Sequence, residues 1–546
     1  MSIVRLSYYL SLPTQSAETT RTHCLSPVAS TSPQYRVKSG VSADLLVANT
    51  SATTFFRFLN ANLANFLRKL FKNTLYNIFT LLFSHHTLCS LEKCVVSAEN
   101  GSVLSMLSSK TFLNLVRTSR SRMSSTFAPK PAERTAQHAA SIWVEFTTLA
   151  AETKAVNLGQ GFPDSPAPKF VTDLLENLSK QPELTAAHQY TRGYGHPMLV
   201  DILAKMYSHF YSVQVDPMNE VLVTVGAYLS LYYAFLGWIN KGDEVLIIEP
   251  AYDCYYPQVK FAGGVPVPVV MNLADGATSA SQFTIDFEDM EKKINGKTKM
   301  LVINNPHNPT GKLFTRQELE KLAEIAKKYN LIVIADEVYE FHVWDKNDMV
   351  RFASLPGMYE RTISIGSAGK AFSVTGWKLG WAVGPKQLLE PLKAIHQNCV
   401  FTCSSPTQMA IAEAFRLDWP KFLNDPKNSY LATGLSGELR GKRDKLAKML
   451  EEGNFRPIIP DAGYFMLADY SHLKEGLKLA SEADPDDFVF SRWLCREKKL
   501  AVIPPSAFYS SRAEKDKNSH MVRLCYFKKN ETLDAAEVIL KKLGKE

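Results

Sequence analysis

The series of short apolar runs between residues 220 and 384 is the feature that most constrains the fold. These runs are rich in β-branched residues, and helix-like segments occupy several of the gaps between them. Apolar strands that alternate with helices predict βα units, and therefore a mostly parallel sheet covered by helices on both faces. We expect seven strands, at 220–225, 243–249, 265–270, 299–304, 331–336, 361–366 and 379–384.

One of the helix-like segments carries its own start signal. The segment "TRQELEKLAEIAKKYN" begins with Thr315 and has Glu318 three residues later, which is the pattern of a capping box. Leu319, Leu322 and Ile325 then follow at helical spacing. We therefore expect a helix here with one apolar face against the sheet.

The pattern changes beyond about residue 430. The helix-like "SGELRGKRDKLAKMLEEG" is followed by "GYFMLADY", by another helix near 486–499 and by "HMVRLCYF". This mixture predicts a second, smaller α+β domain. We divide the chain into a leader (1–126), an N-terminal segment of the small domain (127–165), a large domain (166–430) and a C-terminal small domain (431–546).

The leader differs from the rest of the chain in charge. Residues 1–126 hold 13 lysines and arginines against four acidic residues. The formal net charge of the whole chain is +8, so the other 420 residues carry about −1. Proteins that bind nucleic acid carry a basic face, and the main body lacks the positive charge for one. We expect no nucleic-acid partner.

Two segments of the leader bear on the cell compartment. Residues 55–83 are compatible with an amphipathic helix, but arginines and lysines interrupt them, so we expect no stable membrane insertion. The segment "MLSSKTFLNLVRTSRSRMSST" has the composition of a mitochondrial transit peptide. The alternatives are a disordered basic tail and sequence upstream of a true start at Met106 or Met123. We expect a mitochondrial or cytoplasmic protein, depending on the start.

The cysteine pattern limits the redox and metal chemistry of the chain. The eight cysteines form no CxxC pair and show no zinc-ligand spacing. We therefore expect reduced thiols, a compartment without disulfide formation and no metal site.

Polar residues gather where the predicted strands end. "GAY" follows the first strand, "NPHNPTG" follows 299–304, "ADEVY" closes the strand at 331–336, and "SAGK" follows 361–366. Taken singly, these are ordinary features: a turn, a helix-capping acid, a solvated lysine. Active sites of open α/β sheets lie at the carboxyl ends of the strands. The coincidence of these polar residues at the strand ends predicts a site in which Lys370 is the reacting amine.

These stretches resemble the fold-type-I pyridoxal 5′-phosphate (PLP) enzymes of the class I and II aminotransferases. "NNPHNPTGK", "ADEVYE", "SAGKAFSVTGWKLGW" and "VRLCYF" occur in that family's order and spacing, and the resemblance covers about residues 130–545. "VNLGQGFPD", "HQYTRGYGHP" and "VTVGAYLSLYYAF" are similar to the branch of kynurenine aminotransferases, glutamine transaminase K and cysteine-S-conjugate β-lyases. The resemblance implies an α/β fold of PLP transferase fold type I. Its mostly parallel seven-stranded sheet is covered by helices and joined by a smaller α+β domain.

The resemblance also implies roles for the strand-end residues. Lys370 would form the Schiff base with PLP and then move the proton of the substrate Cα. Desolvation and a positive neighbour lower the pKa of such a lysine and make it nucleophilic at neutral pH. Asp336 would pair with the protonated pyridine nitrogen, which keeps the ring an electron sink, and Tyr339 and Asn308 would hydrogen-bond the ring oxygen O3′. The phosphate would be held by Gly226, Ala227, Ser367 and Lys378.

Aromatic residues complete the implied cofactor site. Tyr252 would stack on the PLP ring and Tyr228 would line the same pocket, the alternative being that both are ordinary core residues. Tyr190 would come from the partner subunit, because this family builds each site across a homodimer interface.

Substrate recognition is implied to depend on Arg523 in "VRLCYF". A planar guanidinium grips a carboxylate with two parallel hydrogen bonds, which a lysine cannot imitate; a structural ion pair is the alternative. The Gly161 amide and Asn308 would assist. Trp143 and Phe162 would form a lid or side pocket suited to flat aromatic or thioether side chains.

Two departures from the family pattern concern the substrate. Thr402 stands where some kynurenine aminotransferases have a histidine, which favours resemblance to the type 3 form over type 1. Ala251 stands where a bulkier aromatic residue is common, and we expect it to enlarge the pocket wall slightly.

The expected activity is ping-pong transfer of an amino group to a 2-oxo acid such as 2-oxoglutarate. L-kynurenine, glutamine, methionine and other large neutral or aromatic amino acids are the expected donors, and β-lyase activity is expected on cysteine conjugates. Another class I aminotransferase or a related PLP lyase is the alternative. A DNA-binding regulator would need a helix-turn-helix module, and a nicotinamide dehydrogenase would need a GxGxxG after the first strand of a βα unit. The sequence offers neither.

Overall fold

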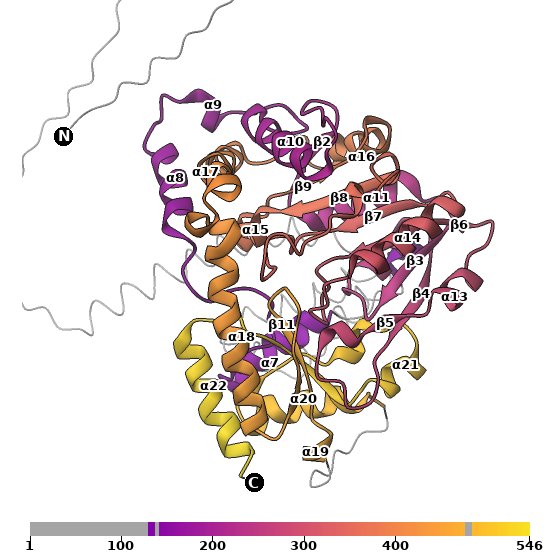
Figure 1. Ribbon diagram of the computed structural model, residues 1–546, viewed down its shortest axis with the longest axis vertical. Coiled ribbons are helices and arrows are strands. Elements are labelled where there is room, and N and C mark those ends of the chain that lie inside the picture. The colour runs from indigo at the N-terminus through magenta and orange to yellow at the C-terminus, as the bar shows by residue number, and fades with distance from the viewer. Residues whose placement is uncertain (1–128, 137–140, 475–482, 546) are drawn as a thin grey trace, which may run out of the picture. The chain divides into compact units, whose positions relative to one another are not determined.

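The computed structural model of the protein describes residues 129–136, 141–474 and 483–545, which belong to one compact unit, Pro129–Glu546 (Figure 1). The predicted leader, with the helix expected over 55–83 and the segment from Met106, lies outside the described residues. The domain boundaries at 166 and 431 stay predictions.

An eight-stranded sheet forms the centre of the larger part of this unit (Figure 1). The five strands β4, β3, β6, β7 and β8 run parallel to one another in that order, while β9 and β2 continue one edge in antiparallel pairing. All seven predicted strands form. An eighth strand, β5, pairs antiparallel with β4 through two residues only, too few to show an alternating pattern. The strands are β2 (Val221–Thr224), β3 (Glu244–Glu249), β4 (Val265–Asn272), β5 (Thr284–Ile285), β6 (Thr298–Asn304), β7 (Ile332–Asp336), β8 (Thr362–Ser367) and β9 (Gly380–Val383).

Helices cover both faces of this sheet, because successive side chains of a strand point to opposite faces. On β6, Val302 packs into a cluster with α11 (Ala227–Trp238), α12 (Tyr255–Phe261) and α16 (Lys386–Cys399). Its neighbours Leu301 and Ile303 pack with α14 on the other face. The remaining helices of this part are α8 (Lys169–Ser179), α9 (Thr185–His188), α10 (Pro197–Tyr211), α13 (Phe287–Lys292), α14 (Arg316–Lys328), α15 (Ala368–Ala371) and α17 (Ser405–Asn424).

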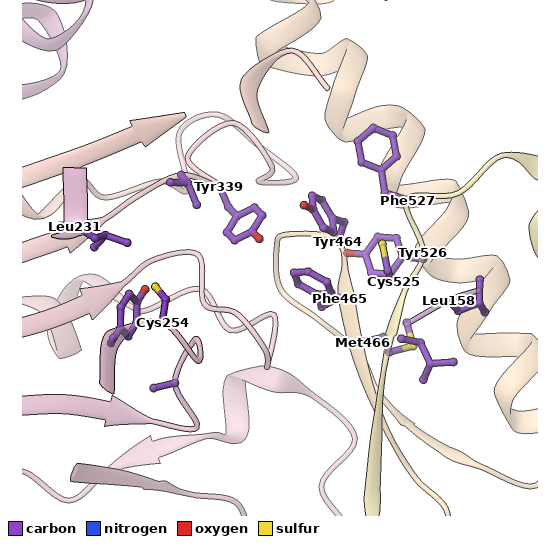
Figure 2. Close-up of a cluster of buried hydrophobic side chains, with 14 of the residues drawn as sticks. Leu158, Leu231, Cys254, Tyr339, Tyr464, Phe465, Met466, Cys525, Tyr526 and Phe527 are labelled. Atoms are coloured by element: carbon purple, nitrogen blue, oxygen red, sulfur yellow. The ribbon is translucent and has the colours of Figure 1, made fainter. Parts of the chain in front are cut away.

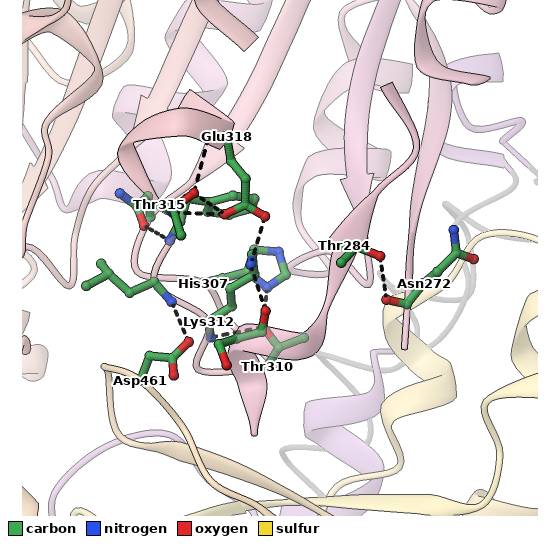
Figure 3. Close-up of polar contacts among 12 residues, drawn as sticks. Asn272, Thr284, His307, Thr310, Lys312, Thr315, Glu318 and Asp461 are labelled. Atoms are coloured by element: carbon green, nitrogen blue, oxygen red, sulfur yellow. Dashed lines mark hydrogen bonds and ion pairs between the residues drawn. The ribbon is translucent and has the colours of Figure 1, made fainter. Parts of the chain in front are cut away.

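Helix α14 begins with the predicted capping box (Figure 3). The Glu318 amide donates to Thr315 Oγ1 at 3.2 Å, and the Thr315 amide donates to Glu318 Oε2 at 2.8 Å. The predicted apolar residues Leu319, Leu322 and Ile325 are buried against the sheet. The sequence prediction for this helix is therefore confirmed.

The C-terminal part is built on a small antiparallel sheet with the order β10-β11-β13. The N-terminal segment joins it, because β1 (Val156–Asn157) pairs in parallel with β12 (Leu500–Ala501). The other strands are β10 (Arg456–Ile458), β11 (Phe465–Asp469) and β13 (Met521–Cys525). The helices are α6 (Glu133–Ala136), α7 (Ile142–Thr153), α18 (Leu435–Glu452), α19 (Ser471–Lys474), α20 (Asp486–Glu497), α21 (Arg512–Lys517) and α22 (Asn530–Leu543).

Short turns of helix connect these elements. They are η2 (Ala280–Gln282), η3 (Phe352–Ser354), η4 (Tyr359–Arg361), η5 (Thr375–Trp377), η6 (Pro426–Asn428), η7 (Tyr430–Gly434) and η8 (Pro505–Phe508). In the part of the chain that the structure describes, the five cysteines are free thiols, and no three histidine, cysteine or acidic side chains are grouped to hold a metal ion. No helix among these residues has the length and apolar character needed to cross a bilayer.

Candidate active site

A cavity of about 210 Å³ lies where β2, β6, β7 and β8 end. Ten of the predicted cofactor residues and the predicted substrate residue Gly161 line it. A shallower depression of about 460 Å³ beside Glu438 and Lys442 contains none of the predicted residues. The full lining of the smaller cavity is Gly161, Gly226, Ala227, Tyr228, Leu231, Tyr252, Asn304, Asn308, Asp336, Val338, Tyr339, Ser367, Gly369, Lys370, Thr375, Lys378, Leu379 and Phe465.

Lys370 presents its amine to this cavity from α15, directly after β8. Its Nζ donates to Tyr464 Oη at 2.6 Å and lies 3.4 Å from the carbonyl oxygen of Gly161. Burial of the amine is the main cause that lowers the pKa of Lys370 to about 8, and the positive charges of Arg523 and Lys378 act in the same direction. A free amine is therefore available near neutral pH, as a nucleophile or proton carrier requires.

This pKa gives a direct prediction for the PLP-free full chain. Acylation of Lys370 by acetic anhydride should rise with pH through a midpoint near 8, because only the neutral amine attacks. Lys386, an exposed lysine, serves as the internal reference for labelling. Peptide mass spectrometry after brief labelling at each pH measures both in one sample. A Lys370 midpoint at 10 or above would contradict the predicted environment.

Asp336 ends β7 beneath the cavity, and its carboxylate is only half satisfied. Oδ2 accepts a hydrogen bond from Tyr255 Oη at 2.6 Å, whereas Oδ1 is buried and has no partner among the described residues. Burial raises the pKa of Asp336 to about 6, partly offset by the Tyr255 hydrogen bond and the charge of Lys370. A buried acceptor without a donor is costly. The unpartnered Oδ1 fits a protonated ring nitrogen, so Asp336 fits the role predicted for it.

The start of α11 borders the same cavity with groups that suit an anion. Gly226 has φ +75°, which favours glycine, and the first amides of the helix have no acceptor within the helix. Lys378 brings its ammonium to this point: a side chain at Gly226 would lie 3.6 Å from Lys378 Nζ. Ser367 adds a hydroxyl that makes no helix-capping hydrogen bond. Backbone amides, one hydroxyl and one cation together fit a phosphate group.

Asn308 lines the cavity and is bonded to Arg523, which lies outside the lining. Arg523 is completely buried on β13, and it donates from Nη1 to Asn308 Oδ1 and from Nη2 to the Gly159 carbonyl, both at 3.0 Å. Its Cζ lies 4.1 Å from the ring centre of Phe465 and 5.2 Å from that of Trp143. Arg523 Nε has no hydrogen-bond partner, and Arg523 takes part in no ion pair, within the described residues. Buried charges are normally paired, so this cation fits a ligand carboxylate.

Four predicted residues lie outside the cavity lining: Arg523, described above, and Trp143, Phe162 and Tyr190. Trp143, on α7, donates from Nε1 to Asp253 Oδ2 at 2.8 Å and packs on Arg523. Phe162 is half-exposed, with the Lys528 ammonium 4.9 Å from its ring centre. Tyr190 is 83% exposed and meets Phe401 edge-on. Their roles stay predictions.

The two departures from the family pattern also lie away from the cavity lining. Ala251 is buried, and its amide donates to the Phe508 carbonyl at 2.7 Å. Thr402 donates to the carbonyl of Cys403 at 3.4 Å. Ala251 is not among the lining residues, and its expected effect on the pocket wall stays a prediction.

Several site residues were not predicted from the sequence. Asn304 donates to the Asp336 carbonyl and accepts from the Asn308 amide at 2.7 Å, so it fixes two neighbouring site residues. Tyr255 bonds Asp336, and Tyr464 bonds Lys370. Asn304 directly precedes "NPHNPTG" and is itself a polar residue at a strand end, so its position could have predicted a role in the site. Tyr464 and Tyr255 carry no comparable signal.

Comparison with known proteins gives consistent matches. The family described as aminotransferase class I and II matches residues 153–539. The chain is 46% identical over 403 residues to kynurenine–oxoglutarate transaminase 3 of Homo sapiens, covering 73% of this chain and 87% of that protein. It is 40% identical over 406 residues to kynurenine–oxoglutarate transaminase 1 of Homo sapiens, covering 73% and 95%. The solved structure of YbdL from Escherichia coli, assigned a methionine aminotransferase function, is 29% identical with a TM-score of 0.66, covering 76% of this chain and all of that one.

Proposed function

This chain belongs to the class I and II aminotransferase family, and we propose that it transfers the amino group of L-kynurenine and other large neutral, aromatic or sulfur amino acids to a 2-oxo acid. The observation that supports kynurenine as donor is the 46% identity, over 403 residues, to kynurenine–oxoglutarate transaminase 3 of Homo sapiens. Membership of the family implies PLP as cofactor.

The residues around the cavity fit PLP, because they leave hydrogen-bonding groups free for its ring nitrogen and its phosphate. Asp336 Oδ1 would receive the ring nitrogen, and the α11 amides with Ser367 and Lys378 would hold the phosphate. When bound, PLP supplies an aldehyde that condenses with amines and a ring that accepts electrons from the substrate Cα–H bond. Tyr339 keeps its phenol proton, since burial raises its pKa, and so is able to donate a hydrogen bond to the ring.

Arg523 and Lys370 would divide the work on the substrate. Arg523, held by Asn308 and Gly159, would bind the α-carboxylate and orient the Cα–H bond toward Lys370. Lys370 Nζ would take the Cα proton as general base, since its lowered pKa leaves it neutral above about pH 8. The donor and the 2-oxo acid both carry a carboxylate on the carbon that reacts. One Arg523 therefore serves both in turn, as ping-pong transfer requires.

Elimination from cysteine conjugates is a second activity that the same residues would support. Once Lys370 has taken the Cα proton, a sulfur substituent on Cβ leaves as a thiolate while a Cα–Cβ double bond forms. This needs no residue beyond those assigned to transamination. Release of a thiol from a cysteine S-conjugate, absent with alanine, would measure it.

We propose further that the enzyme is a homodimer. The exposed aromatic pair formed by Tyr190 (83% exposed) and Phe401 (52% exposed) supports this, because such residues are enriched at interfaces. The compartment, mitochondrial or cytoplasmic, depends on the true start. Mass spectrometry of the native N-terminus distinguishes them.

The donor is tested with the PLP-loaded protein, L-kynurenine and 2-oxoglutarate. We expect kynurenine to disappear and glutamate to form in equal amounts, with no glutamate when the 2-oxo acid is omitted. Methionine and glutamine should serve as slower or comparable donors. Aspartate should serve poorly, because no arginine lines the cavity in the described residues, and Arg523, bonded to the lining residue Asn308, is already assigned to the α-carboxylate. Transfer from aspartate but not kynurenine would overturn the proposed donor and keep the family.

A further inference from the structure

The amine of Lys370 is held by Tyr464, the residue just before β11. Lys370 Nζ donates to Tyr464 Oη at 2.6 Å, and Tyr464 Oη donates to the carbonyl oxygen of Gly161 at 2.7 Å. A phenol has one proton. Since that proton is directed to Gly161, the oxygen of Tyr464 acts only as an acceptor toward Lys370.

The carbonyl that orients Tyr464 is itself fixed. All four carbonyls from Gly159 to Phe162 accept hydrogen bonds from the C-terminal part or from Lys370. Lys528, 2% exposed, donates to the carbonyls of Gln160 at 3.0 Å and Phe162 at 2.8 Å. A side chain on Gly161 would lie 2.5 Å from Phe465 Cζ, so the segment packs without free space there. The orientation of the Gly161 carbonyl is therefore fixed.

Tyr464 is also protonated and held by packing. Its side chain is buried, and its ring lies 5.2 Å from Tyr339 and 5.4 Å from His342, centre to centre (Figure 2 shows Tyr339 and Tyr464). Burial raises the pKa of Tyr464 well above its ordinary value and lowers the pKa of His342 to about 3, so both groups are neutral. The titratable and charged groups that face Lys370 are Asp336, Tyr339, His342, Lys378, Tyr464, Arg523 and Cys525.

These contacts determine how a neutral Lys370 amine points. Such an amine has two N–H bonds and one lone pair. One N–H is taken by Tyr464 Oη at 2.6 Å, and the second has the Gly161 carbonyl at 3.4 Å. The acceptors belong to Tyr464, just before β11, and to Gly161 at the cavity wall, so both N–H bonds are engaged and the lone pair is left for the cavity.

We propose that Tyr464 is a positioning residue for Lys370, which accepts one N–H of the amine and so directs its lone pair into the cavity. This deepens the proposed function and rests on it, because it concerns the amine that would capture PLP. The capture step is balanced without an oxidant: Lys370 Nζ bonds to the aldehyde carbon, two amine protons leave with the aldehyde oxygen as water, and nothing is reduced.

Tyr464→Phe separates positioning from deprotonation, because it removes the oxygen and keeps the ring. A hydroxyl acceptor favours the charged amine, so its loss should leave the labelling midpoint of Lys370 at or below that of the wild type. The rate of PLP capture by the PLP-free full chain, followed by visible absorption at pH 9.5, should nevertheless fall about tenfold, as expected for a lost positioning contact. If Tyr464 acted only by shifting the pKa of Lys370, the variant would capture PLP at the wild-type rate or faster at pH 9.5.

Tyr526→Phe is the matched control. Tyr526 is another buried tyrosine next to the small sheet, directly after β13, and it donates to the Gly463 carbonyl at 2.9 Å without contacting Lys370. It should capture PLP at the wild-type rate. Wild-type capture by Tyr464→Phe, or an equal loss in Tyr526→Phe, would overturn the proposal.

Two features keep this test independent of other failures. If Tyr464→Phe does not fold, judged by near-ultraviolet circular dichroism, Tyr464→Met fills similar space without the oxygen and is scored in the same way. PLP capture involves neither an amino acid nor a 2-oxo acid. A wrong donor assignment would therefore leave the capture result intact, whereas loss of positioning would appear with any donor.

Discussion

Replacing Lys370 with alanine is expected to abolish transamination from every donor, with kcat lowered by roughly 10⁴-fold, the upper end of what one acid–base group contributes. Lys370 and Lys378 are the two lysines that line the cavity in the described residues. The Lys378 amine lies beside Gly226, at the start of α11. No neighbouring group would take over the proton. Single-turnover measurement with L-kynurenine tests this.

The same variant should fold normally. Tyr464 would still donate to the Gly161 carbonyl after the amine is gone, so no buried donor loses its partner. Removal of a buried cation also relieves a desolvation cost. We expect the free energy of unfolding to change by about 1 kcal/mol or less, measured by urea denaturation of the PLP-free chain.

Two matched variants show whether the amine or the charge is needed. Lys370→Arg keeps a cation but offers no neutral nitrogen at accessible pH, and it should be as inactive as the alanine variant. Lys386→Ala removes an exposed lysine of α16 that pairs with Glu390, and it should behave as wild type. Substantial turnover by Lys370→Ala would refute the assignment of the reacting amine.

The sequence predicted the sheet because its information there is local. Each of the seven strands is a short apolar run, and the start of α14 is fixed by the pair Thr315 and Glu318, three residues apart. The site followed from one topological rule, that strand ends meet at one edge of a sheet. That rule brought Gly226, Asp336 and Lys370 together before any coordinates.

The residues that were missed act over long sequence separations. Tyr464 reaches Lys370 across 94 residues, and Tyr255 reaches Asp336 across 81. Tyr464 reaches the cavity because the small sheet packs against it, and Tyr255 reaches Asp336 because α12 packs on the central sheet. No periodicity or spacing in the chain reports that packing. Residues such as Lys528, which fastens the segment 160–162 from 366 residues away, are visible only in the fold.

Arg523→Lys should lower kcat/KM for L-kynurenine by roughly 10²-fold, mostly through KM. A lysine keeps the buried positive charge but replaces two parallel hydrogen bonds with one, and a hydrogen bond between charged groups contributes about 1.5–3 kcal/mol. The unpartnered Nε of Arg523 marks the donor that a carboxylate would use. Steady-state kinetics with varied kynurenine measures the effect.

A substrate that lacks the carboxylate separates carboxylate binding by Arg523 from an effect of Arg523 on the fold. With the corresponding decarboxylated amine, wild type and Arg523→Lys should react at similar, low rates, because the lost contact has no partner on this substrate. Arg492→Lys is the matched control: Arg492 on α20 pairs with Glu145 and Asp484, each at 2.6 Å, and faces no cavity residue. It should retain wild-type kinetics. An equal loss for kynurenine and for the amine would mean that Arg523 acts through the fold, by holding Gly159 and Asn308, rather than by binding substrate.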